Sequence, residues 1–509
     1  MSINKKIIVA AVAGLTLGAT SCRKYLDVNE NPNIAHEVTV TTMLPAAQLY
    51  VGSAIGTDLQ VNGSIWSQFW TQTPIGKEYI PFEQCAPTAA SYDAGWKNLY
   101  AGASNFYQVE KLSVAQHKAQ YQAIALLMQA YTFQALTDAW GDVPFKNALK
   151  GQYPDGHMVN PSYDSQKVVY KGIIGYIDSA KKLINFNDPS HPGADDLVYG
   201  GDMRKWMKFA NTLKLRALLR MAQVDPVYAQ TSLDTLMMGA PQFIGEGDDA
   251  RIVYGAGMTN GNPLYSELNS IELGGIQQLA GSKSCIDSIN TNNDYRGAVN
   301  YRLLPTVGLV GITQSAYDIT LPNGSYSIPN VYTGADISSA SSATAPVMLL
   351  SSWESFFLQA EAVASGMAVG NDVQLFYNGI HASFNYHSNN LLSEIGVTGQ
   401  DAYDIYVNGD VPNSIPAAYW SMYPTGGTAS DKVRHILTQK WFSMCGTQGF
   451  EAWNEWRRTG YPDFLVAPRN SRIGTTVPSR FLYPASEAAT NSNFPGLMPV
   501  ITRVWWDVL

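Results

Sequence analysis

The chain has 509 residues, with 33 Lys and Arg against 41 Asp and Glu, a formal net charge of −8. No Lys/Arg stretch interrupts this acidic balance, which argues against a nucleic-acid partner. Charged residues make up only 15% of the chain, below the usual quarter, whereas Tyr is abundant at 29 residues. A surface short of charge suits neutral, hydroxyl-rich ligands better than ionic ones.

The chain begins with the pattern of a secretory signal, which we assign to residues 1–21. Lys5 and Lys6 precede eleven uncharged residues from Ile7 to Leu17, a run too short for the roughly 20 apolar residues that span a bilayer. Ala19 and Ser21 fit ordinary release of a soluble protein. Small residues leading directly into Cys22 fit instead a lipobox, although the usual large apolar residue three positions earlier is absent.

Cys22 is therefore expected to be acylated and to become the mature N-terminus, the alternative being an ordinary thiol. Residues 22–35 contain the polar stretch "RKYLDVNENPN", which predicts a flexible tether. Without the signal and its two lysines, 31 basic residues face 41 acidic ones, a balance of −10. No later segment has the length and apolarity of a membrane span.

The strongly periodic segments after the tether predict a mainly α-helical fold. In residues 203–223, apolar side chains recur at i, i+3 and i+4 spacing. Adjacent helices with alternating Ala and aromatic positions are typical of tetratricopeptide-like hairpins, although no strict 34-residue period exists. About eight helices in four adjacent pairs are expected at 92–112, 119–139, 164–184, 203–223, 351–366, 372–388, 430–446 and 450–458.

Long segments rich in Gly, Ser, Asn and Tyr separate these helices. Residues 224–350 form the longest, and residues 389–428 and 459–509 have the same character. Structureless loops of such length are rare in compact domains unless they carry function. We expect short strands, turns and ligand-contacting loops there, forming a ligand-binding face.

No recognised catalytic or cofactor motif occurs in the sequence. Metalloprotease helices, phosphate loops, dinucleotide fingerprints, serine elbows and Cys-x-x-Cys pairs are all missing. We therefore expect no cofactor, no metal ion and no enzymatic activity. A glycosidase needs only two well-placed carboxylates, so an exported glycan hydrolase stays open as an alternative.

Two further residue groups are given structural roles. After Cys22 the chain has three more cysteines, Cys85, Cys285 and Cys445. Because their number is odd and their spacing wide, we expect buried thiols rather than a disulfide scaffold. Asp287, Asn290, Asn292 and Asp294 lack the glycine and glutamate of a calcium loop and predict a turn.

Three aromatic-rich segments predict anchors that fasten loops to helices. They are "TDAWGDVPF" (137–145), "QKWFSMCGTQGFEAWNEWRRTGYPD" (439–463) and "VPSRFLYPASEAATN" (477–491). Trp side chains supply contact area, and paired arginines at a helix end complement its dipole and bind its carbonyls.

These segments resemble the SusD/RagB family of outer-membrane nutrient-binding lipoproteins. The resemblance covers nearly the whole chain and includes "SCRKYLDVNENPN", "WGDVPF", "FANTLKLRALLRMA", "FFLQAEAVASG", "FYNGIHASFNYH", "WNEWRRTGYP" and "SRFLYPASEAATN". It implies four tetratricopeptide-like helix pairs with an irregular ligand-binding face, in one SusD-like domain over residues 36–509.

The same resemblance implies a location and a partner. Family members are lipid-anchored at the cell surface on the outer membrane and act as a lid on a SusC-like TonB-dependent transporter. Many bind glycans and some bind peptides, so a peptide-binding member is a second alternative. The implied role is capture of a nutrient, an oligosaccharide above all, for uptake.

Aromatic rings in the irregular segments are the predicted sugar platforms, because rings offer large contact area at low rotamer cost. Periodic aromatics such as Trp96 are assigned to the core instead. The predicted platforms are Trp70, Tyr79, Phe82, Tyr254, Tyr265 and Tyr332. The predicted polar ligand contacts are Asn262, Gln277 and Asp318.

Overall fold

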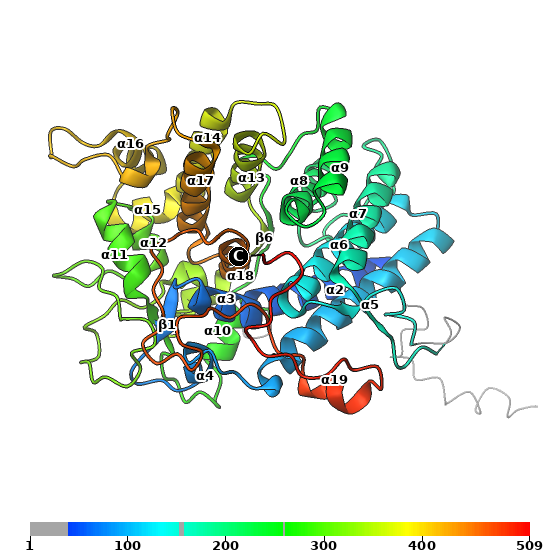
Figure 1. The fold of residues 1–509 in the computed structure, drawn as a ribbon, viewed down its shortest axis with the longest axis horizontal. Coiled ribbons are helices and arrows are strands. Elements are labelled where there is room, and N and C mark those ends of the chain that lie inside the picture. The colour runs from blue at the N-terminus through cyan, green and yellow to red at the C-terminus, as the bar shows by residue number, and fades with distance from the viewer. Residues whose placement is uncertain (1–38, 152–156, 258–259, 509) are drawn as a thin grey trace, which may run out of the picture.

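The structure is a computed structural model that describes residues 39–151, 157–257 and 260–508. The predicted signal, Cys22 and the whole tether at 22–35 lie outside these residues. The described chain is mainly helical, and Figure 1 shows α5 to α9 on one side of the molecule and α11, α12, α15 and α16 on the other. Helices α13, α14 and α17 lie between these two groups.

The eight predicted helices are all present, with bounds close to those expected. They are α5 (Asp93–Ala115), α6 (Ala119–Trp140), α7 (Gln166–Leu183), α8 (Met203–Met221), α13 (Ser352–Ala364), α14 (Asp372–Tyr386), α17 (Ala429–Met444) and α18 (Gly449–Thr459). Helix α5 packs against α6, α6 against α7, and α13 against both α14 and α17. The mainly helical prediction with paired helices is confirmed.

Local sequence signals explain several helix ends. Asp202 begins α8 by accepting hydrogen bonds from the backbone N–H groups of Arg204 at 2.9 Å and Lys205 at 3.2 Å. Thr428 and Asp431 form a reciprocal capping box at the start of α17. Gly460 ends α18 in the left-handed region, with φ of 73°.

The segments expected to be irregular contain more helix than the sequence indicated. They hold α9 (Pro226–Met238), α10 (Pro263–Leu268), α11 (Lys283–Thr291), α12 (Gly297–Asn300), α15 (Ser388–Ile395), α16 (Gly399–Asn408) and α19 (Ala485–Thr490). The turn expected from Asp287 onward is wrong up to Thr291, because α11 runs through it. Its Asp287 pairs with Lys283 one turn earlier at 2.8 Å.

In the part of the chain that the structure describes, three two-stranded antiparallel sheets accompany the helices. They pair β1 (Trp70–Gln72) with β5 (Leu279–Gly281), β2 (Val143–Pro144) with β3 (Tyr163–Asp164), and β4 (Ala250–Ile252) with β6 (Val347–Leu350). In the last pair Ile252 lies opposite Val347, and Arg251 opposite Met348. The short strands expected in the central segment are therefore present, and they connect it to distant parts of the chain.

The N-terminal part of the described chain forms an additional helical layer. It consists of α2 (Val40–Ala54), the π-helical turn Ile55–Leu59, α3 (Gln60–Trp66) and the short α4 (Ile80–Glu83). Helix α2 packs along α5, and α3 packs against α18. The largest hydrophobic core draws side chains from α2 at one end of the described chain to α18 near the other, and it includes Trp140, Trp206 and Trp453.

The three aromatic-rich segments meet in the structure, which confirms their role as anchors. Residues 477–491, which we call the C-terminal clasp, run past the end of α6. The Trp140 indole N–H donates to the Leu482 carbonyl at 2.9 Å, and the Phe481 N–H donates to the Ala139 carbonyl at 2.7 Å. Arg457 on α18 donates to the Ser479 carbonyl at 2.6 Å. The clasp therefore fastens α6 and α18 to each other.

Candidate functional site

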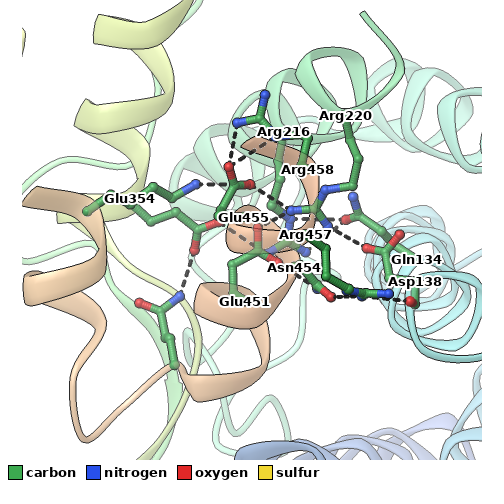
Figure 2. Close-up of polar contacts among 12 residues, drawn as sticks. Gln134, Asp138, Arg216, Arg220, Glu354, Glu451, Asn454, Glu455, Arg457 and Arg458 are labelled. Atoms are coloured by element: carbon green, nitrogen blue, oxygen red, sulfur yellow. Dashed lines mark hydrogen bonds and ion pairs between the residues drawn. The ribbon is translucent and has the colours of Figure 1, made fainter. Parts of the chain in front are cut away.

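A group of buried, paired charged side chains lies where α6, α8, α13, α17 and α18 meet (Figure 2). Five cations face five carboxylates there, so their formal charges cancel. The members of this ion network are Asp138, Arg216, Arg220, Glu354, Glu361, Lys440, Glu451, Glu455, Arg457 and Arg458. All ten are buried.

The pairing within the ion network is close. Arg220 reaches Asp138 at 2.5 Å and Glu455 at 2.8 Å, and it also contacts Glu451. Arg458 binds both oxygens of Glu361, at 2.7 and 2.8 Å. Burial alone would raise the pKa of Glu455, but Arg458, Lys440 and Arg220 outweigh it and hold that pKa well below its usual value.

The ion network offers no room for a ligand. The cavity beside it, lined among others by Asp138, Arg216 and Glu451, has a volume of about 20 Å³, space for about one water molecule. Its carboxylates are already paired with cations. We interpret the network as the joint that fixes the helix pairs to α18.

An open polar cavity, which we call the polar pocket, has the size of a ligand site. Its volume is about 420 Å³, within the range of small-molecule sites. It is lined by Arg251, Val331, Tyr332, Ser341, Thr344, Ala345, Pro346, Tyr386, His387, Asn389 and Asn390.

Four separate stretches of chain bring these residues together. Arg251 lies on β4, and Pro346 directly precedes β6 in the sequence. The pairing of β4 with β6 brings the two residues to the same cavity. Tyr332 lies on the 3-10 turn Val331–Thr333, and Ser341 and Thr344 lie on the 3-10 turn Ala340–Thr344. The remaining side chains come from the junction where α14 ends and α15 begins.

Aromatic contacts hold the α14–α15 junction in place. The Tyr386 ring packs on Trp353 with 4.9 Å between centroids, and Trp353 is fully buried on α13. The Arg251 guanidinium lies 5.4 Å from the Tyr386 ring centroid, within the range of a cation–π contact. Tyr386 is thereby fixed between the core and the pocket.

The electrostatics of the polar pocket are close to neutral. Arg251 is its one permanently charged lining residue, and none of the lining residues is acidic. Burial and then the nearby Arg296 lower the pKa of His387 to about 3, so its imidazole is uncharged at neutral pH. The Tyr332 hydroxyl donates to Glu394 at 3.0 Å. Such a lining can form hydrogen bonds to hydroxyl and amide groups.

Of the predicted aromatic platforms, Tyr332 lines the polar pocket. Trp70, Tyr79 and Phe82 are 0%, 4% and 8% exposed, so in this conformation their rings face core neighbours. Tyr79 and Phe82 pack on each other with 6.1 Å between centroids. Tyr254 and Tyr265 are half-buried and lie outside the lining.

The predicted polar contacts hold loops together. Asn262 caps α10 and donates to the Ala345 carbonyl at 2.8 Å, which supports one wall of the polar pocket. Gln277 donates to the carbonyls of Leu279 and Ala335 at 2.9 and 3.0 Å. Asp318 is exposed and pairs with Arg469 at 3.5 Å. The structure does not bring these three into the pocket.

Sequence reasoning did not select Tyr386, Asn389 and Asn390. Tyr386 lies in the periodic segment 372–388, and the aromatic side chains of periodic helices are expected in the core. The available signal was the end of that helix, where "NYHSNN" (385–390) places a ring and amides side by side.

Two other open cavities differ in chemistry. One, of about 330 Å³, is mostly apolar and lies between the α9 end and the α13–α14 connection. The other, of about 430 Å³, is bordered by Lys181, Arg204 and Lys208. The polar pocket combines two tyrosines with amides and hydroxyls, which is the composition expected for sugars.

Comparison with known proteins gives concordant results. A family described as "Starch-binding associating with outer membrane" matches residues 32–484. No curated protein matches the chain. Within the described residues, no helix combines the length and apolarity needed to cross a membrane.

Solved structures share the fold across their whole lengths. A chitin-binding protein is 24% identical with a TM-score of 0.73, covering 91% of this chain and 100% of its own. A chitin-binding SusD homolog from Flavobacterium johnsoniae is 23% identical with a TM-score of 0.71, covering 91% and 98%. A SusD homolog from Bacteroides uniformis is 22% identical with a TM-score of 0.72, covering 92% and 99%. The fold and the match over residues 32–484 place this chain in the SusD-like family.

Proposed function

We propose that this protein is a cell-surface lipoprotein that captures an oligosaccharide in the polar pocket and delivers it to a SusC-like TonB-dependent transporter. Acylated Cys22 and the tether at 22–35 hold it on the outer membrane, and it acts by binding rather than by catalysis. The family description and two chitin-binding structural neighbours support a glycan as the ligand class.

The observation that carries the proposal is the lining of the polar pocket. Tyr332 and Tyr386 line a cavity of about 420 Å³ with Asn389, Asn390 and Ser341. Tyrosine rings can pack against the C–H faces of sugars, and amides and hydroxyls can bond their hydroxyl groups. A lining without carboxylates favours a neutral ligand such as a chitin or starch fragment.

Calorimetry with chitin and starch oligosaccharides tests this proposal. Truncation by Tyr332→Ala removes one ring, so we expect a loss of about 1 to 3 kcal/mol of binding free energy, the range of an interface aromatic. Tyr332→Phe keeps the ring and removes the hydroxyl with its bond to Glu394, so its affinity should stay near that of the wild type.

Tyr419→Ala is the matched control, because this ring is 57% exposed and lies outside the polar pocket. It should bind like the wild type. Equal affinity of the wild type, Tyr332→Ala and Asn390→Ala for an oligosaccharide that binds would contradict the pocket assignment. Binding of a peptide mixture in place of every sugar would favour the peptide alternative, and steady release of reducing ends would favour a hydrolase.

A further inference from the structure

Two of the cysteines in the described residues touch each other in the core. The Sγ atoms of Cys285 and Cys445 are 3.8 Å apart, and both residues are at most 1% exposed. Cys285 lies in the first turn of α11, and Cys445 directly follows α17. Their positions are 160 residues apart in the sequence, so the contact depends on the tertiary fold.

We propose that Cys285 and Cys445 form a disulfide bond when the chain folds in the presence of a disulfide oxidant. Exported chains meet such oxidants, so this bond accompanies the proposed surface location but does not depend on glycan binding. A disulfide needs its sulfurs at about 2.05 Å. Sulfurs already in van der Waals contact can reach that distance through side-chain rotation and small backbone shifts.

The surroundings tolerate the loss of both thiol protons. The Tyr301 hydroxyl lies 3.3 Å from the Cys445 sulfur but also donates to the Phe69 carbonyl at 2.7 Å. It therefore keeps a strong acceptor after oxidation. A thiol is only a weak donor, so the bond leaves no strongly polar group unpaired.

The chemistry balances by thiol–disulfide exchange with a small-molecule disulfide such as oxidised glutathione. One cysteine thiolate attacks the oxidant, forms a mixed disulfide and releases one glutathione thiolate. The second cysteine thiolate attacks the mixed disulfide at the cysteine sulfur and releases the other. Two electrons pass to glutathione, and the two cysteine protons end on its two thiols.

Burial determines when the exchange can occur. In the folded chain, burial and the neighbouring Cys445 raise the pKa of the Cys285 thiol well above its usual value, so the reactive thiolate is scarce. The oxidant also cannot reach an enclosed sulfur. The bond must therefore form before the core closes, and afterwards the same enclosure shields it from reductants.

Oxidative refolding of the full chain tests the proposal. Cys22→Ser leaves Cys85, Cys285 and Cys445 as the cysteines, and the denatured protein is refolded with oxidised and reduced glutathione. We expect a mass about 2 Da below that of the all-thiol chain, because two hydrogens leave. Alkylation in denaturant should modify Cys85 alone, and a digest should contain the Cys285 and Cys445 peptides joined.

Cys85 supplies the matched control, because it is equally buried but has no cysteine neighbour in the described residues. Cys85→Ser should keep the joined peptides and the same mass loss, and its melting temperature should fall after refolding in reductant. Cys285→Ser should show neither the mass loss nor sensitivity to reductant. Should that variant fail to fold, the digest of the parent chain decides alone. Three alkylated cysteines after oxidative refolding, or a bond involving Cys85, would overturn the proposal.

Discussion

The pair formed by Glu361 and Arg458 allows a quantitative test of the ion network. Both Glu361 oxygens bind the Arg458 guanidinium, at 2.7 and 2.8 Å, and the two side chains are 5% and 7% exposed. Arg458→Met keeps an unbranched apolar stem but leaves the Glu361 carboxylate buried without its cation. Glu455, the other partner of Arg458, retains Lys440 at 3.4 Å and Arg220 at 2.8 Å.

The expected loss of unfolding free energy is about 3 to 5 kcal/mol, the range found when one partner of a buried pair is removed. The loss of unfolding free energy has a comparable upper limit, because the unpaired Glu361 carboxylate can instead take up a proton. For a glutamate with a reference pKa of about 4.3, carrying a proton at pH 7 costs about 3.7 kcal/mol, at about 1.36 kcal/mol per pH unit. The destabilisation of Arg458→Met should therefore diminish as the pH falls towards the reference pKa of glutamate.

Urea unfolding of the wild type, Arg458→Met, Glu361→Met and the double variant measures this coupling. The double variant should be less destabilised than the sum of the two single variants, because no charge is stranded. The single Arg458→Met should regain stability between pH 7 and pH 5, and the double variant should not. Additive losses with no dependence on pH would show that the pair is not acting as a buried salt bridge.

Three other predictions concern pH, the anchor and the partner. Burial raises the pKa of Glu83 from 4.5 to about 7, so the folded state holds a proton that the unfolded chain has released, and stability falls as the pH rises between these values. Glu83→Gln cannot release this proton, so the decrease in unfolding free energy with rising pH should be smaller by about 3 kcal/mol than in the wild type. A difference between variant and wild type in urea unfolding that does not change with pH would refute this prediction. Cys22→Ala should move the protein from the membrane to the soluble fraction; a variant that stays membrane-bound, with no lipid on the wild type by mass spectrometry, would exclude the anchor. Gentle detergent extraction should recover a TonB-dependent barrel with the protein, and repeated recovery of the protein alone would count against that partner.

The helical scaffold could be predicted because its signals are local. In α8 the apolar spacing that indicated the helix is also the face buried in the structure, where Trp206, Phe209 and Leu213 are fully enclosed. The layer formed by α2 and α3 was not predicted. Pro45 lies inside α2, and a π-helical turn separates α2 from α3, so the periodic signal is interrupted where the packing is continuous.

The candidate site could be predicted only in part, because it is assembled from distant segments. Tyr332 could be predicted from the sequence, because it is an aromatic residue in an irregular segment. Trp70 met the same criterion, yet the pairing of β1 with β5 places it in the core. Local composition cannot distinguish the pocket environment of Tyr332 from the core environment of Trp70, because strand pairing decides which of the two rings is buried. The polar pocket depends on the same kind of long-range pairing, between β4 and β6.

The C-terminal clasp has a consequence for the order in which the molecule is completed. Trp140 and Leu482, which it joins, are 342 residues apart in the chain. A chain that emerges N-terminus first therefore presents α5 and α6 long before their last partner exists. During that interval the Trp140 indole and the Ala139 carbonyl have no clasp to bond, and contacts of such separation form slowly. The helices made early thus receive their final contacts only after nearly the whole chain has appeared.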